Sequence, residues 1–398
     1  QRGPQSFDVV LRLSGSPRLK DVPEFGGFAI SEASPTEPGG AAGKHFVKQH
    51  DLTCFARKEV EAVDFLPAAI SARQAFETQL DLLRFDYERR VVNIEDTCHV
   101  SRVDDERSKL LTVQMAVPNP VENVDLDGFD SFVKTVDEVC KKESIEASSR
   151  AQLEAAIRQY RFGRDNTSYR DMFLNWWMGL EALTRIDGGG SIGSTVTNNT
   201  SKVLSIEYFS RLLRDLQATL KHCKIQWPKE LADFTSCSAV NDLTLSQLLL
   251  ILQSEDKTKI LLAQCRDNPT LEYRTNWIGD WLRDPKKALE RFDSHHKNVE
   301  WQVQRLYRIR CCILHGSLIR HRLGLFTANL EFYLKQTILF ALKSFHNNDQ
   351  IKSLHDLYSR TAIATDRIIA SLNAEDAGPD QVREVVFAGA VTRERTST

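Results

Sequence analysis

The pattern of hydrophobic and polar positions divides the chain into two parts. In the first part, short apolar or alternating runs are typical of strands, and they lie at 7–13, 52–56, 98–103 and 110–115. One segment among them, 67–87, instead repeats its apolar residues at helical spacing and predicts a helix with Pro67 in its first turn. The stretch 31–43 is rich in Pro, Gly and Ser, which indicates a loop. The first part is therefore expected to be α+β.

The second part of the chain has a helical pattern almost to its end. The prolines within 118–120 interrupt the pattern and indicate a linker. Apolar residues then recur at helical spacing at 127–143, 146–163, 168–186, 205–222, 244–265, 285–315, 324–346 and 350–373. From Ala374 onward large apolar residues are few, which favours a flexible tail. We therefore expect three regions, an α+β domain at 1–120, a helical domain at 121–373 and a tail at 374–398.

Composition and charge exclude several classes of protein. Of the 398 residues, 41% are hydrophobic and 27% are charged, which is typical of a globular protein with two domains rather than a disordered or fibrous one. The 52 basic and 54 acidic residues nearly cancel, so any RNA site must be a local basic patch. The longest apolar runs, such as 248–252, are far shorter than the roughly 20 residues that cross a bilayer, and no secretory signal is visible. We expect a cytoplasmic protein without a membrane span.

The candidate metal ligands do not form a convincing site. The eight cysteines include no C-x-x-C pair, which argues against a structural zinc site and predicts mostly buried thiols. Cys311 and Cys312 are adjacent, which strains a disulfide, so they are expected to be packing thiols. His295 and His296, with Asp293 nearby, would point about 100° apart on a helix and have no further ligand at fitting spacing. We expect neither a metal nor a cofactor.

A glycine-rich segment, 188–193, matches the G-x-G-x-x-G pattern of dinucleotide-binding loops. That pattern requires a strand before it and a helix directly after it. Here a helical pattern precedes the glycines, and the polar run 195–201 predicts that the loop continues. A flexible connection is the favoured interpretation.

Two segments carry the residues best suited to chemistry. In 307–316, Arg310 is followed by four residues and then by His315, near the end of a long helical pattern. A histidine can take or return a proton near neutral pH, and an arginine offers a permanent charge and planar donors to a phosphate. The other segment, 169–183, is an apolar helix that carries Glu181 within its apolar register. A buried carboxylate is costly unless it is paired, so a cation is expected to contact Glu181.

Together the two segments resemble the HEPN superfamily of ribonucleases, particularly its ApeA-like branch. Family members carry a helix of the form W-x-x-L-E-x-L, which here is 177–183. Several helices later they carry an arginine, four to six residues and a histidine often followed by glycine, which here are Arg310, His315 and Gly316. The resemblance covers roughly 127–346. It implies a mainly α protein in which a C-terminal HEPN-like helical bundle is preceded by a smaller α+β domain.

The resemblance also implies a function, that of a metal-independent endoribonuclease acting as a homodimer or a higher homo-oligomer. Arg and His pairs from two chains would face one cleft, where histidine assists attack by the ribose 2′-hydroxyl and arginine steadies the phosphate. By position these roles fall to Arg310 and His315, with Glu181 in the supporting acidic position. The implied substrate is RNA, with tRNA as one candidate, and the implied role is that of a toxin or antiviral defence effector. Residues 1–120 would sense a trigger or bind a regulatory partner.

The choice of arginine stays open on the sequence alone. Arg308 is the alternative, because six residues separate it from His315 and this spacing also falls within the family range. On a regular helix seven positions return to the same face, whereas five place Arg310 and His315 about 140° apart. Gly316 indicates that the helix ends near His315, which would relax this constraint, and family usage favours Arg310. The residue after the motif arginine, usually polar, is here Cys311, so a catalytically inactive HEPN-like scaffold that binds RNA, a nucleotide or a partner protein is the alternative function.

Other residues near the motifs have two interpretations each. Arg320, His321 and Arg322 follow the motif and would suit RNA phosphates beside the cut, although a solvated loop explains them equally well. Trp176 and Trp177 are of a type that stacks on bases, but their apolar neighbours favour the core. A helical regulator in which the motif arose by chance is a third interpretation of the whole chain.

Overall fold

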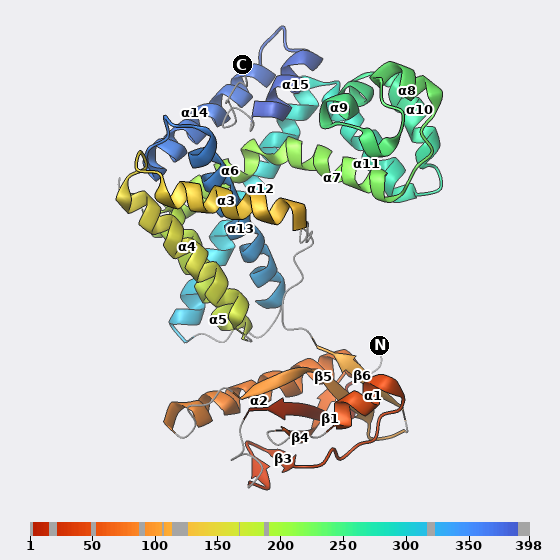
Figure 1. Ribbon diagram of the computed structural model, residues 1–398, viewed down its shortest axis with the longest axis vertical. Coiled ribbons are helices and arrows are strands. Elements are labelled where there is room, and N and C mark those ends of the chain that lie inside the picture. Colours follow the sequence, from red (N-terminus) through yellow and green to blue (C-terminus); the bar gives the residue numbers. More distant parts are fainter. Residues whose placement is uncertain are drawn as a thin grey trace. The chain divides into compact units, whose positions relative to one another are not determined.

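The protein is represented by a computed structural model that describes residues 3–15, 22–48, 53–86, 92–105, 107–113, 126–166, 168–186, 191–316 and 323–388. Two compact units divide the chain, one formed by 1–117 with 167–169 and the other by 118–166 with 170–398. An antiparallel sheet region comes first and a long helical region follows, as Figure 1 shows. The fold is mainly α with an α+β N-terminal part, as the hydrophobic pattern predicted.

The N-terminal unit is built on an antiparallel sheet. Its strands, in the part of the unit that the structure describes, are β1 (Gln5–Ser14), β2 (Glu24–Phe25), β3 (Phe28–Ser31), β4 (Thr53–Ala62), β5 (Asn93–Arg102) and β6 (Ser108–Thr112). Their order across the sheet is β2-β3-β4-β1-β5-β6. The four predicted strands correspond to β1, β4, β5 and β6. The other two strands are too short to give a pattern in the sequence.

Two helices cover the two faces of this sheet. On one face, α2 (Phe65–Asp86) packs small and aromatic residues against Val9 and Leu11 of β1. On the other, Val10 packs against Phe46 of α1 (Gly40–Val47). Because both faces of β1 are covered, Val10 adds an apolar residue to the second face and interrupts the alternation of apolar and polar residues along the strand. The expected loop at 31–43 is correspondingly shorter, since α1 begins at Gly40.

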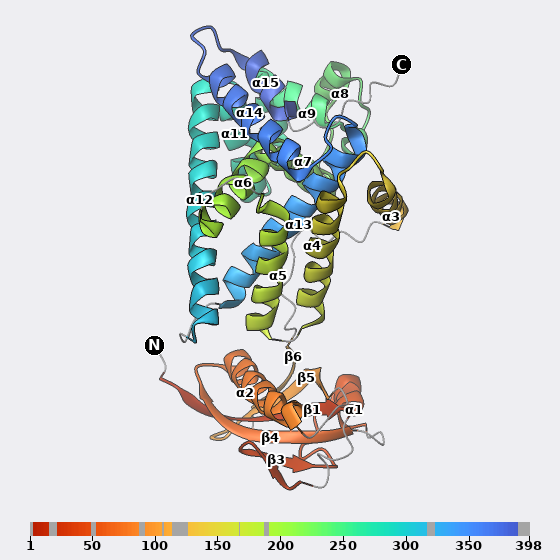
Figure 2. The same ribbon diagram turned by 90° about the vertical axis from the view of Figure 1, so that its left-hand side faces the viewer.

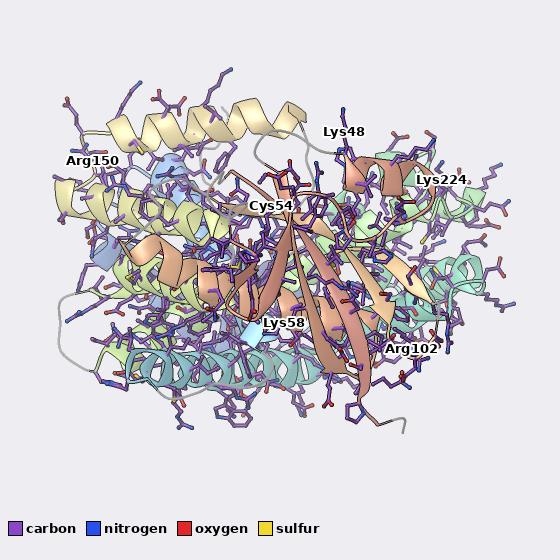
Figure 3. All side chains as sticks on the ribbon, turned by 90° about the horizontal axis from the view of Figure 1, so that it is seen from below. Lys48, Cys54, Lys58, Arg102, Arg150 and Lys224 are labelled. Atoms are coloured by element: carbon purple, nitrogen blue, oxygen red, sulfur yellow. The ribbon has the colours of Figure 1, made fainter. Side chains whose placement is uncertain are left out.

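Buried arginines tie the sheet to its surroundings. Arg12 of β1 donates to Glu95 Oε2 at 2.7 Å and to the carbonyl of Lys48 at 2.8 Å. Arg73 of α2 donates to backbone carbonyls within β5 and just after β6. In Figure 3, Lys48 marks the end of α1, and Lys58 on β4 has its Nζ 4.7 Å from the ring centre of Phe28. Such charge-assisted bonds hold the buried guanidinium groups of Arg12 and Arg73 in place, although Arg12 Nε is buried without a partner.

The C-terminal unit consists of helices. These are α3 (Leu126–Lys141), α4 (Ala147–Asp165), α5 (Tyr169–Thr184), α6 (Ile192–Ile206), α7 (Tyr208–His222), α8 (Lys229–Thr235), α9 (Leu245–Gln253), α10 (Glu255–Cys265), α11 (Pro269–Leu282), α12 (Pro285–Leu314), α13 (Leu323–Asn347), α14 (Leu354–Leu372) and α15 (Pro379–Ala388), with a 3-10 turn at Val240–Asp242. Figure 2 shows α12 running along the length of the unit, with α6 beside it. Among the described helices, none has both the length and the apolar content to span a membrane.

The helix α6 corrects the expected loop at 195–201. Ser191 caps its start by accepting a hydrogen bond from the backbone of Ser194, and Asn199 donates to the carbonyl of Thr184 at 2.8 Å. The small side chains of this segment are buried and let α6 pack closely on α12. The prediction failed because small polar residues allow a tight contact between helices: Ser205 bonds to a carbonyl one turn back, while the hydroxyls of Thr197 and Thr200 are buried without a partner. The glycines at 188–190 lie outside the described residues.

The C-terminal segment corrects the expected tail. Helix α15 lies within 374–398, and Val382, Val385 and Val386 are buried in a core shared with α7, α11 and α14. The helix is short, but its three valines are spaced to cover one face. Helices α8 and α11 were also not predicted, although Asn268 as N-cap and Pro269 as first residue are signals that identify the start of α11.

Candidate functional site

The two motif segments meet through side chains in the helical unit. Arg170 at the start of α5 donates from Nη2 to the carbonyl of Ile313 at 3.2 Å, across 143 positions of sequence. The last carbonyls of a helix lack partners within the helix, so this arginine fastens the end of α12 to α5. Further along α5, Glu181 Oε2 lies 3.9 Å from Arg310 Nη2. The structure therefore brings together two of the predicted site residues, Glu181 and Arg310.

The carboxylate of Glu181 is held from several sides. Its side chain is 17% exposed, and Trp177 Nε1 donates to Oε2 at 3.0 Å. Arg185 Nη1 lies 3.7 Å from Oε1 of Glu181. A cation was expected near Glu181, and two are present, Arg185 and Arg310. Trp176 and Trp177 are buried, which confirms their place in the core. The bond from Trp177 was not predicted, although a donor four residues before a carboxylate on a helix is a visible signal in the sequence.

Tyr307 positions the turn of α12 that carries Arg310. Its ring centre lies 5.7 Å from that of Trp177 on α5. On its other side a Cβ added to Gly193 of α6 would come within 2.8 Å of the ring, so only a glycine leaves room for it. Cys311, the residue after the motif arginine, interacts with the Tyr307 side chain and raises the pKa of its phenol. The site is thus built where α5, α6 and α12 converge.

The end of α12 determines the direction of the His315 side chain. The helix ends at Leu314, and Gly316 adopts a left-handed φ of +74°, as its position predicted. However, the N–H of His315 still donates to the carbonyl of Cys311 at 3.0 Å, so the helical register reaches the backbone nitrogen of His315. The expected relaxation begins only at His315 itself, whose φ of −91° and ψ of +15° lie outside the helix.

The two candidate arginines consequently lie on different sides of α12. Arg308 and His315 are both exposed and share one face, because seven positions complete about two turns. Arg310 leaves the helix about 140° from His315. Its side chain is 26% exposed and faces Glu181. A single chain therefore pairs Arg310 with the carboxylate and aligns Arg308 with the histidine.

The other predicted residues lie elsewhere. Arg320, His321 and Arg322 fall outside the described residues. His295 stacks on Tyr208 with ring centres 3.8 Å apart, and burial lowers the pKa of His295 to about 4. Within the described ranges no three His, Cys, Asp or Glu side chains are grouped to hold a metal ion.

The cysteines are only partly as predicted. Four of the eight are buried, namely Cys54, Cys98, Cys237 and Cys265, and burial raises the pKa of Cys98 to about 12. Cys140 and Cys311 are half-buried, and Cys223 and Cys312 are exposed, so the prediction of mostly buried thiols holds for half of them. All eight are free thiols.

One further buried carboxylate was not predicted from the sequence. Glu331 on α13 is 1% exposed, and its Oε1 accepts from Tyr160 at 3.0 Å and lies 3.3 Å from Arg164 Nη1. Both partners come from α4, so the group joins two helices and is satisfied by them. Glu331 therefore stabilises the packing of α13 on α4 and is not placed to act as a reactive acid.

The geometry of α5 and α12 offers acid–base and anion-binding chemistry. The arrangement contains an exposed imidazole, two guanidinium groups and a carboxylate that orients one of them. Comparison with models of protein families, with curated proteins and with solved structures finds no match to the chain. A functional assignment therefore depends on the two motif segments and their contacts.

Proposed function

We propose that the chain is a metal-independent endoribonuclease whose site is completed by a second copy. The observation that carries the proposal is the contact between Glu181 of the W-x-x-L-E-x-L helix and Arg310 of the arginine–histidine helix. These segments resemble the two motif helices of HEPN ribonucleases, and they are far apart in sequence. A site that contains residues of both helices requires such a contact between their side chains.

The chemistry assigned to the site is transesterification of RNA. His315 takes the proton of a ribose 2′-hydroxyl, and the 2′-oxygen forms a bond to phosphorus while the bond to the 5′-oxygen breaks. The same imidazole, now protonated, returns the proton to the departing 5′-oxygen. The products are a 2′,3′-cyclic phosphate and a 5′-hydroxyl, and the step consumes neither water nor metal. Arg310 stabilises the charge that gathers on the phosphate, and Glu181 positions its guanidinium.

A second copy is part of the proposal for a geometric reason. Arg310 and His315 leave α12 about 140° apart, so one chain alone does not direct both side chains at one phosphate. Two copies whose α12 ends face one cleft would supply the arginine from one chain and the histidine from the other. We assign the whole protein the role of a toxin or antiviral effector, with the N-terminal unit sensing a trigger or binding a regulatory partner.

The alternative function is that of a catalytically inactive scaffold that binds RNA, a nucleotide or a partner protein. One observation favours it. Cys311 interacts with Tyr307 instead of offering a polar group to the motif arginine. A scaffold predicts binding that survives the loss of His315.

Incubation of the purified protein with total RNA and tRNA in EDTA tests the proposal. We expect fragments whose 5′ ends accept phosphate from a kinase and whose 3′ ends become reactive only after the cyclic phosphate is removed. Fragments with free 3′-hydroxyls, or cleavage that EDTA abolishes, would contradict the assigned chemistry. RNA that is bound but stays intact, also after cellular activation of the protein, would support the scaffold.

A further inference from the structure

One face of α12 combines an exposed tryptophan with cationic side chains. Trp301 is 64% exposed in the middle of this long helix. Lys297 precedes it by one turn, Arg305 follows it by one turn, and Arg308 follows by two, all of them exposed. Residues spaced by three, four and seven positions share a helix face. We call these four residues and His315 the α12 stripe.

The stripe is basic although the chain as a whole is slightly acidic. The formal net charge of the protein is −2, yet between 291 and 315 no exposed residue of α12 is acidic. The nearest carboxylate on the helix, Glu300, is half-buried and lies 3.6 Å from His296 Nε2. The stripe is therefore a local basic patch. The near-zero net charge of the chain means that any RNA site must be such a patch.

The exposed indole is what indicates the class of ligand. Other tryptophans of the helical unit, such as Trp176, Trp177 and Trp281, are buried in the core. An aromatic ring flanked by cations suits an unpaired base stacked between backbone phosphates, and such stacking tolerates any base. A second copy is a poor occupant of the stripe between 297 and 308, because a two-fold contact there would bring cationic side chains of one copy against those of the other.

We propose that the α12 stripe binds single-stranded RNA and leads the strand to His315. Trp301 stacks on a base, while Lys297, Arg305 and Arg308 contact phosphates. Trp301 lies fourteen residues before His315, which is about 21 Å of helix, so the contacts fall upstream or downstream of the cut rather than at it. The direction toward His315 rests on the proposed function, but the binding itself does not.

Binding is measured with a 5′-labelled, unstructured RNA of about 12 nucleotides, which is within the usual size of such sites. The background is His315→Ala, so that the RNA stays intact, and the readout is fluorescence anisotropy. We expect Trp301→Ala to raise the Kd roughly 5- to 100-fold and Trp301→Phe to retain most of the affinity. Arg305→Ala should weaken binding and make the dependence of log K on log salt shallower by about 0.7.

The matched control is Tyr273→Ala, which removes a similarly exposed aromatic side chain (68% exposed) from α11. It should leave the Kd unchanged. Equal Kd values for Trp301→Ala and Tyr273→Ala would overturn the inference. A Trp301→Ala variant that binds RNA normally but alters the monomer–dimer equilibrium without RNA would overturn it as well, and would make this face an interface between copies.

The result also separates this inference from the proposed function. Cleavage by the wild-type protein together with unchanged binding by Trp301→Ala would contradict the stripe and leave the ribonuclease intact. Loss of binding in Trp301→Ala together with no cleavage by the wild type would support the stripe and contradict the ribonuclease. Because Trp301 is largely exposed, its replacement is expected to leave the thermal midpoint of unfolding nearly unchanged.

Discussion

Replacing His315 by Ala should lower the rate of RNA cleavage about 10²- to 10⁴-fold, the range that a general acid–base side chain contributes. His315 follows the last residue of α12 and its side chain is exposed. The change therefore removes the imidazole without opening a cavity in the core, and the variant should unfold at the same temperature as the wild type. Initial rates on an end-labelled RNA at equal protein concentration measure the effect.

The chain offers a matched control for this change. His222 is also exposed and ends a helix, α7, so His222→Ala removes the same side chain from an equivalent local setting. We expect its cleavage rate to equal that of the wild type. If His315→Ala and the wild type cut at the same rate, the activity does not depend on this imidazole and the assigned mechanism is wrong.

Arg310→Ala should lower kcat about 10²- to 10³-fold, as the loss of one donor to the charged transition state does in other enzymes. Arg308→Ala should instead raise KM and leave kcat nearly unchanged, because Arg308 is exposed on the α12 stripe while Arg310 lies beside Glu181. Steady-state kinetics on one RNA separate the two effects.

The opposite pattern would reassign the role of the arginine. If Arg308→Ala lowers kcat and Arg310→Ala does not, the arginine that shares a face with His315 is the one that stabilises the transition state. Glu181→Gln serves as the control for positioning, since it keeps an acceptor for Trp177 Nε1 but removes the charge that Arg310 faces. It should lower kcat less than Arg310→Ala does.

The main features of the fold could be predicted because they depend on local periodicity. The apolar spacing of the long helices α5, α12 and α13 is visible in the sequence, as is the run that forms β1. Helix α6 could not be predicted in the same way, since Thr197, Thr200 and Ser201 face the core although they are polar. Only the neighbouring helix α12 explains why small residues are needed there.

The candidate site was predictable in part. The cost of burying Glu181 predicted a cation beside it, and the structure has Arg310 and Arg185 there. Which arginine shares a face with His315 depends on how far the helical register extends, and Gly316 alone does not reveal that it reaches the backbone nitrogen of His315. The spacing of Trp301, Arg308 and His315 by seven was readable in the sequence, but the exposure of Trp301 became visible only in the fold.

Mixing the Arg310→Ala and His315→Ala variants tests the central claim, a site shared between two copies, most directly. Each variant alone should be nearly inactive. A symmetric dimer contains two equivalent combinations of Arg310 from one copy and His315 from the other, and a mixed dimer keeps one of the two. After subunit exchange of equal amounts about one half of the dimers are mixed, so activity should recover to about one quarter of the wild-type rate. If mixed dimers form, as two different affinity tags would show, and cleavage stays at the level of the separate variants, the composite site is contradicted.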